Sequence, residues 1–196
     1  MIPFPDKKYN IIYADPPWGY KDKRDKHPRM SGGATSHYNT MNIEDIKNLP
    51  IKYITEDNCM LFLWTTFPNL QEGLDVIKAW GFTYKTLGFS WIKLNTKNLK
   101  PFFGIGYYTK SNCECCLIGV KGKPIIKNND VSSVLMEPRE RHSKKPDIVR
   151  DKIVRLVGDL PRIELFARDK TEGWDVWGNE VESDIDLNSI TQNLTQ

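Results

Sequence analysis

The stretch that decides the fold is Tyr9-Asn-Ile-Ile-Tyr-Ala14, followed directly by Asp15-Pro16-Pro17-Trp18. Its first six residues are aromatic, apolar or β-branched apart from one asparagine, which is typical of a buried strand. The run ends at Asp15, and the two prolines fix φ at about −65° in the backbone that follows. The sequence therefore predicts a central strand that runs into a rigid turn.

Apolar periodicity outward from this stretch predicts further elements. We expect strands at 59–64, 86–93, 115–120 and 162–167, and helices after the cap Asn42, at 70–80 with Gly81 as its stop, and at 147–157. Residues 18–40 and 127–145 are charged and lack apolar period, which indicates two long loops. Strands that alternate with helices predict an α/β fold with a doubly wound, mostly parallel sheet and helices on both faces.

Composition limits the class of protein. With 196 residues and 39% hydrophobic content, we expect one domain at 1–182 and a polar, flexible tail at 183–196. No apolar run approaches the roughly eighteen residues of a membrane span, and the start lacks a leader pattern. We therefore expect a cytoplasmic protein of a bacterium or a phage-infected host. Glycine-rich dinucleotide and Walker phosphate motifs are absent from the sequence.

The cysteines are four, and three of them fall between 113 and 116, which is too crowded for a disulfide framework. Structural zinc needs two spaced pairs of ligands, and the sequence offers no second pair. We expect reduced thiols in strands or core, and no metal. The histidines, His27, His37 and His142, have no ligand spacing.

Residues 15–18 also combine groups suited to chemistry on an aromatic amine. Such an amine is a poor nucleophile because its lone pair is delocalised into the ring. The Asp15 carboxylate and a carbonyl of the Pro16–Pro17 segment could accept hydrogen bonds from both amine hydrogens. Trp18 could offer a flat face to an unstacked base, at the strand end where open α/β sheets bind ligands. The simpler alternative is a turn that closes a strand, with Trp18 packed on the core.

Three more segments accompany this motif: Glu114-Cys-Cys-Leu-Ile-Gly-Val-Lys-Gly122, Ser143-Lys-Lys-Pro146, and Glu164-Leu-Phe-Ala-Arg168 with Gly173-Trp-Asp-Val-Trp-Gly-Asn-Glu180. Together, from Tyr9 to about Glu182, they resemble the MT-A70 family of adenine N6-methyltransferases, in the permuted order with the catalytic strand first. The resemblance implies a Rossmann-like fold dependent on S-adenosylmethionine (SAM), with direct methyl transfer to a flipped or single-stranded adenine in nucleic acid.

We expect DNA as substrate because the chain is compact and carries no appended RNA-binding module. RNA adenine, the N4 amine of cytosine, and a non-catalytic nucleic-acid-binding subunit stay open as alternatives, as do a homodimer and a heterodimer. Methylated-base mass analysis separates the chemistries, and the intact Asp15 speaks against the non-catalytic subunit.

The resemblance also implies residue roles. The catalytic group is Asp15, Pro16, Pro17 and Trp18. The cofactor group is Asp15, Pro16, Lys145, Phe166, Arg168, Asn179 and Glu180, with Lys145 reaching the cofactor carboxylate and the target base. For the substrate, the resemblance implies Glu114, Tyr20 and Lys145, and the full group that we expect is Tyr20, Lys21, Arg24, Tyr38, Glu114, Ser143 and Lys145. Without the family, Asn179 and Glu180 read as a polar turn and Arg168 as a surface arginine. Residues 169–173 lack the histidine and asparagine of some relatives.

The net charge of only +3 means that nucleic-acid binding must depend on where the charges lie. Two basic segments flank the expected site: Lys21, Lys23, Arg24, Lys26 and Arg29 in the first, and Arg139, Arg141, Lys144 and Lys145 in the second. Phosphate contacts from such segments give salt-sensitive affinity without sequence preference. The alternative is a pair of solvated loops.

Overall fold

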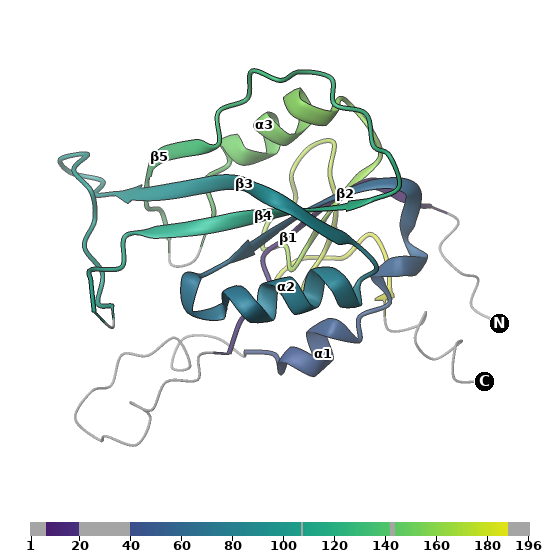
Figure 1. Ribbon diagram of the computed structural model, residues 1–196, viewed down its shortest axis with the longest axis horizontal. Helices are drawn as coiled ribbons and strands as arrows, with labels where there is room; N and C mark the ends of the chain where they lie inside the picture. Colours follow the sequence, from purple (N-terminus) through teal and green to yellow (C-terminus); the bar gives the residue numbers. More distant parts are fainter. Residues whose placement is uncertain (1–6, 20–39, 107, 142–143, 188–196) are drawn as a thin grey trace.

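The computed structural model describes residues 7–19, 40–106, 108–141 and 144–187. Its strands are β1 Tyr9–Ala14, β2 Thr55–Thr65, β3 Thr83–Leu94, β4 Cys113–Lys121, β5 Val134–Pro138, β6 Arg162–Leu165 and β7 Asp175–Trp177. In this described part they form a seven-stranded sheet in the order β5-β3-β4-β2-β1-β6-β7 (Figure 1).

Helices lie on both faces of the sheet, as predicted. One face carries α1 Ile43–Lys47 and α2 Leu70–Ala79, and the other carries α3 Ile148–Val157 (Figure 1). Short 3₁₀ turns at Ile51–Tyr53 and Phe67–Asn69 precede β2 and α2. Asn42 caps α1, because its side chain accepts a hydrogen bond from the Glu44 N–H at 3.1 Å. Gly81, with φ of 83°, follows α2 as the expected stop.

The sheet is mixed but mostly parallel, which confirms the predicted fold class. β1 runs parallel to β2 and β6, β6 to β7, and β3 to β5. Only β4, among the described strands, is antiparallel to its neighbours β2 and β3. Because β4 runs the other way, its start lies at the same edge of the sheet as the ends of β1, β2 and β3.

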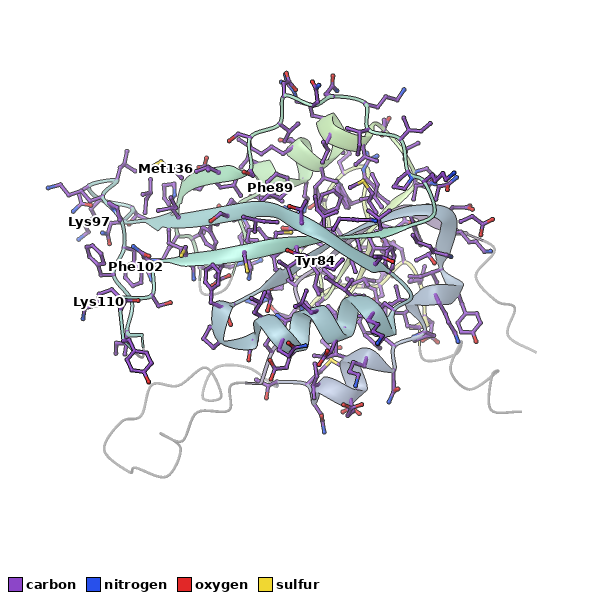
Figure 2. All side chains as sticks on the ribbon, viewed as in Figure 1. Tyr84, Phe89, Lys97, Phe102, Lys110 and Met136 are labelled. Atoms are coloured by element: carbon purple, nitrogen blue, oxygen red, sulfur yellow. The ribbon has the colours of Figure 1, made fainter. Side chains whose placement is uncertain are left out.

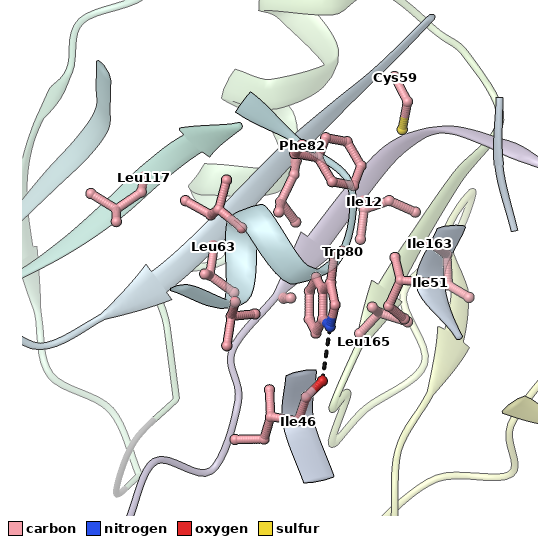
Figure 3. Close-up of a cluster of buried hydrophobic side chains, with 14 of the residues drawn as sticks. Ile12, Ile46, Ile51, Cys59, Leu63, Trp80, Phe82, Leu117, Ile163 and Leu165 are labelled. Carbon is pink, nitrogen blue, oxygen red and sulfur yellow. Dashed lines mark hydrogen bonds between the residues drawn. The ribbon is translucent and has the colours of Figure 1, made fainter. Parts of the chain in front are cut away.

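Side chains along β1 point alternately into two hydrophobic cores, one on each face of the sheet. Ile12 packs toward α1 and α2, whereas Ile11 and Tyr13 pack toward α3. In the first core Trp80 is 1% exposed, and its indole N–H donates to the Ile46 carbonyl at 2.8 Å, which ties α1 to α2 (Figure 3). Each large apolar side chain buried in this way contributes about 1.5–3 kcal/mol. Trp91 is buried in the second core.

Three boundaries differ from the prediction. β5 lies inside the expected loop 127–145; it is an edge strand with only Leu135 fully buried, so its apolar pattern is weak. β7 spans three residues, too few for a periodic signal. β6 ends at Leu165 and not at Ala167, because Phe166 takes a left-handed φ of 62°. The expected loop 18–40 lies almost wholly outside the described residues.

Residues 183–187, the described part of the expected tail, make contacts with β7 and the core. The Asp184 backbone N–H donates to the Val176 carbonyl at 2.8 Å, and the Asp184 carboxylate accepts from the Val176 N–H at 2.9 Å. Leu187 is fully buried in the core beneath α1 and α2. This segment therefore packs on β7 as part of the domain.

The cysteines are core and strand thiols, as predicted. Cys59, Cys115 and Cys116 are buried and unpaired, and Cys113 is half-buried. Burial raises the pKa of Cys115 to about 11 and that of Cys59 to about 12, which keeps both thiols protonated. No helix in the described ranges has the length and apolar content that crossing a bilayer demands.

Candidate active site

The candidate site lies at the carboxyl edge of the parallel strands. Ala14 pairs with Leu165, and Leu165 pairs with Trp177. The next residue on each strand, Asp15, Phe166 and Gly178, therefore lies in a row across β1, β6 and β7. Neighbouring strands are about 4.8 Å apart, so the row is roughly 10 Å wide. Sequence elements separated by more than 150 residues meet in this row.

Asp15 is paired with Lys145 at the centre of the edge. The Lys145 ammonium donates to the Asp15 carboxylate, with an Nζ to Oδ2 distance of 2.7 Å. The two side chains are 11% and 27% exposed. Burial raises the pKa of Asp15 above its ordinary value, and the ammonium of Lys145 opposes that rise. Burial alone would lower the pKa of Lys145, but the carboxylates of Asp15 and Glu114 outweigh it and raise it.

Glu114 extends this pair into a chain of alternating charges. Its Oε2 lies 3.2 Å from the Lys145 Nζ, and its Oε1 accepts a short hydrogen bond from Lys93. Burial would raise the pKa of Glu114, but Lys145 and Lys93 together hold it below its ordinary value. The network is thus Lys93, Glu114, Lys145 and Asp15, with two cations and two carboxylates.

The backbone of the proline segment forms a tight turn. The Trp18 N–H donates to the Pro16 carbonyl at 2.8 Å, which is an inverse γ-turn, and the Met41 N–H donates to the Pro17 carbonyl at 3.0 Å. A carbonyl oxygen has two lone pairs, so each of these carbonyls can accept one more hydrogen bond. The hydrogen-bonding capacity that the expected second acceptor needs is therefore present in both carbonyls, although the Pro16 residue as a whole is buried.

Trp18 is placed differently from our main expectation. Its side chain is buried in the first core, with 8% exposed, and its indole N–H donates to the Trp64 carbonyl at 2.9 Å. The Trp64 indole in turn donates to the Tyr13 hydroxyl at 2.7 Å. The Trp18 ring therefore offers no open face to a base in this structure. It anchors the turn to β2, as in the simpler alternative.

The cofactor candidates on β6 and β7 also come together. Arg168 Nε lies 3.3 Å from Glu180 Oε1, and both side chains keep exposed surface. Phe166 packs edge-to-face on Trp177, with ring centroids 5.3 Å apart. The charge of Arg168 also lowers the pKa of Asp15, against the dominant effect of burial.

A hollow of about 500 Å³ opens beyond the end of β7. It is lined by Trp177, Gly178, Asn179 and residues 183–186. A Cβ atom at Gly178 would lie 2.1 Å from the Ala167 carbonyl oxygen. Only glycine therefore allows the backbone after β7 to pass this close to the backbone after β6. The hollow does not reach Asp15, but it adjoins the end of the same row of residues.

These residues fit an elongated cofactor with a cationic centre, an amino-acid end and a ribose. Asn179 and Glu180 offer a donor and acceptors for ribose hydroxyls, and Lys145 offers a cation for a carboxylate. The hollow is within the usual size range of small-molecule sites. Arg168 pairs with Glu180, one residue after Asn179 in the lining of the hollow.

Part of the expected substrate group cannot be placed. Tyr20, Lys21, Arg24, Tyr38 and Ser143 lie outside the described residues, as does the first basic segment. The second basic segment is largely neutralised by its neighbours: Arg141 pairs with Asp169, Lys144 with Glu140 and Asp147, and Lys145 with Asp15 and Glu114. These three cations are therefore not free for phosphate in this structure.

Two features escaped the sequence analysis. Lys93 is the last residue of the strand predicted at 86–93. A charged side chain at the end of an apolar strand was the signal that could have indicated its role. Arg150 and Glu164 form a buried two-bond pair, with N to O distances of 2.7 and 3.1 Å, that joins α3 to β6. The sequence did contain a signal for this pair. Glu164 lies between two apolar residues of a predicted strand, and Arg150 lies on the face of a predicted helix that packs on the sheet.

The fold and the site define an α/β enzyme of the SAM-dependent methyltransferase class. The chain belongs to the MT-A70 family, whose model matches residues 9–180. This confirms the resemblance found in the sequence.

Individual relatives agree with this assignment. Type II methyltransferase M.MunI of Mycoplasma sp is 36% identical over 192 residues, which cover 90% of this chain and 79% of the relative. The human N(6)-adenosine-methyltransferase catalytic subunit METTL3 is 29% identical over 180 residues, 89% of this chain and 28% of its own. The Drosophila melanogaster N(6)-adenosine-methyltransferase MT-A70-like protein is 30% identical over 94% of this chain and 29% of its own. The chain thus spans less than a third of these two animal relatives.

Proposed function

We propose that this methyltransferase acts on the exocyclic N6 amine of adenine in nucleic acid, with DNA as the first substrate to test. The observation that carries the proposal is the Asp15 carboxylate beside two proline carbonyls with spare lone pairs, at the carboxyl edge of the sheet. Support also comes from the relatives in the same family that are named N(6)-adenosine-methyltransferases.

The proposed chemistry is a direct transfer. S-adenosylmethionine supplies an electrophilic methyl group on sulfur. Asp15 and a carbonyl of Pro16 or Pro17 accept hydrogen bonds from the two amine hydrogens, which localises the nitrogen lone pair and aims it at that carbon. One carbon–nitrogen bond forms, one carbon–sulfur bond breaks, and the alkylated amine loses one proton to Asp15 or to water.

Asp15 must accept the amine hydrogen bond while Lys145 already occupies one of its oxygens. In the structure Lys145 binds Oδ2 of Asp15, so the amine binds either the other oxygen or displaces the ammonium. Glu114 lies 3.2 Å from the same ammonium and would hold it in place after displacement. Lys145 would then be free to bind the cofactor carboxylate while its charge stays compensated.

DNA is proposed before RNA because of how much of each relative the match covers. The relative matched over most of its own length is the type II methyltransferase, whereas the relatives named for adenosine match over less than a third of theirs. A nucleic-acid substrate would also place the enzyme in the cytosol of a bacterium or an infected host.

The test is SAM-dependent methylation of matched DNA and RNA oligonucleotides, with mass analysis of the modified base. We expect N6-methyladenine, more of it on DNA. Asp15→Asn should lower the transfer rate by about 100-fold or more, because one positioned charged acceptor is lost. Asp130→Asn, which alters an exposed carboxylate on the far side of α3, should keep the wild-type rate.

Each other result contradicts a part of the proposal. Methylation of cytosine N4 alone would assign the alternative chemistry. Nucleic-acid binding without any transfer would indicate a non-catalytic subunit, and a wild-type rate for Asp15→Asn would refute the role of Asp15.

A further inference from the structure

The segment between β3 and β4, residues 95–106 and 108–112, forms an arm that leaves the carboxyl edge of the sheet. Its base is closed by bridges between Leu94 and Pro101 and between Gly104 and Ser111. Within it, the Asn95 N–H donates to the Lys100 carbonyl at 2.9 Å. Figure 2 shows Lys97, Phe102 and Lys110 together beyond the ends of the strands. The arm is thus an ordered projection on the same edge as Asp15.

The arm is basic and carries no acidic residue. Lys97, Lys100 and Lys110 are exposed, and the sequence from 95 to 112 contains neither aspartate nor glutamate. No carboxylate in the described part of the chain pairs with these lysines. Elsewhere Lys144, Arg141 and Arg155 are each held by a carboxylate. The positive charge of the arm is therefore available to a ligand.

Large apolar side chains stand among these lysines. Phe103 is 65% exposed and Tyr108 is fully exposed, as are large parts of Leu99 and Ile105. Exposed aromatics next to cations are the features with which proteins bind single-stranded nucleic acid, because bases stack on the rings and phosphates pair with the cations. The core of a protein–protein interface, by contrast, is depleted in lysine.

The arm is continuous with the candidate site. The Arg139 guanidinium stacks on the Phe102 ring, 3.4 Å from its centroid, and the Arg139 N–H donates to the Leu94 carbonyl. Lys93, one residue before Leu94, donates to Glu114, which binds Lys145 beside Asp15. The arm and Asp15 therefore lie at one edge of the sheet and are linked by a short chain of contacts.

We propose that this arm binds the nucleic-acid strand next to the target base, with its lysines on phosphates and Phe103 and Tyr108 stacked on bases. The proposal rests on the proposed function for its substrate class. It names a surface that neither of the two basic segments found in the sequence includes, apart from Arg139 at its base.

Charge reversal tests the arm against a matched control. The arm variant is Lys97→Glu, Lys100→Glu and Lys110→Glu. The control is Lys78→Glu, Lys85→Glu and Lys123→Glu, three exposed lysines at the opposite edge of the sheet that give the same change in net charge. The readout is the Kd for a fluorescent single-stranded DNA, measured by anisotropy at several salt concentrations.

We expect the arm variant to bind at least about 10-fold more weakly, with a log Kd against log salt slope reduced by roughly 2. The control should stay within about 2-fold of wild type, and both variants should bind S-adenosylhomocysteine normally. Phe103→Ser with Tyr108→Ser should weaken DNA binding by about 10-fold at unchanged net charge, through lost stacking.

The proposal that the arm binds nucleic acid would be overturned by wild-type DNA affinity in the arm variants or by an equal loss of affinity in the control. It would also be overturned if the aromatic variant changed only the sedimentation coefficient, which would indicate a protein partner. The proposed function is tested separately. DNA binding that depends on the arm but yields no methylated adenine would refute the proposed function and support the role of the arm. Normal methylation by the arm variants would support the proposed function and refute the role of the arm.

Discussion

Lys145 lies between two carboxylates, and this position sets what each of them can do. A buried charge is tolerated only when it is compensated, and breaking such a pair leaves an uncompensated charge behind. Asp15 can exchange Lys145 for a substrate amine because Glu114 still balances the ammonium. Lys93 in turn balances Glu114. The proposed acceptor therefore depends on a residue three steps away in the network.

Lys93→Met should show this dependence as a pH-dependent loss of stability. The pKa of Glu114 is held below its ordinary value, so its ionised form stabilises the fold. That contribution is present above the unfolded-state pKa of about 4.3 and is lost as pH falls through the lower folded-state value. We expect Lys93→Met to cost about 1–3 kcal/mol at pH 7, the strength of a hydrogen bond to a charged group.

The measurement is urea unfolding between pH 7 and pH 3. The gap between wild type and Lys93→Met should narrow as Glu114 becomes protonated. Lys47→Met, which breaks an exposed pair with Glu44, should leave a small gap at every pH. A gap for Lys93→Met that stays constant down to pH 3 would show that Glu114 is not the group involved.

At this scale the sequence predicts residue types better than their orientation. Asp15, Glu114 and Lys145 could be named from their motifs, and the structure brings them together. The sequence left open whether Trp18 is exposed or packed on the core, because its partner is the carbonyl of Trp64, 46 residues along the chain. Lys93 was missed because its role depends on the register of β3 against β4.

Among the elements, α3 and β6 are joined by a buried ion pair. Arg150 on α3 binds both oxygens of Glu164 on β6 and also Asp147 at the start of the helix. Burial raises the pKa of Glu164, and the Arg150 guanidinium opposes this rise. The pair fixes the end of α3 that follows Lys145, so it also fixes the position of that lysine.

Arg150→Met should destabilise the protein by about 3–5 kcal/mol, because Glu164 would remain buried without a cation. Arg155→Met is the matched control. Arg155 lies on the same helix and pairs with a carboxylate, Asp130, but both side chains are more than half exposed. Its effect on stability should be much smaller, because water and salt screen an exposed ion pair. Chemical denaturation gives both values.

A second variant separates the ion pair from packing. Arg150→Met with Glu164→Met removes both charges and should recover much of the stability lost in Arg150→Met alone. If the double variant is less stable than the single one by a further several kcal/mol, the arginine acts through its packing and not through its charge.

Elements were predictable where their own side chains carry the signal. The bounds of β1 match the prediction because its apolar run ends at a proline turn. β5 and β7 were missed because they are short and are stabilised by hydrogen bonds from a neighbouring strand. The antiparallel direction of β4 could not be predicted either, because a buried strand has the same apolar run in a parallel or an antiparallel pairing.

Across the whole molecule, the sheet order separates two functions around Asp15. The cofactor candidates follow β6 and β7 on one side of β1, and the arm follows β3 on the other side. Cofactor and nucleic acid would therefore approach Asp15 from opposite sides of the same edge. This arrangement predicts that changes on one side leave binding on the other side intact.

Thermal unfolding with S-adenosylhomocysteine tests that separation. At 100 times its Kd, a ligand that binds only the folded state stabilises by about 2.7 kcal/mol. For a domain of this size that corresponds to a rise in Tm of roughly 5–10 °C. We expect the same rise in Tm in wild type and in the arm variant, Lys97→Glu with Lys100→Glu and Lys110→Glu.

Glu180→Ala, which alters a half-exposed side chain, should keep the ligand-free Tm but lose most of the rise at the same ligand concentration. A full rise in Glu180→Ala would remove this residue from the cofactor site, and a lost rise in the arm variant would show that the two sides of the edge are coupled.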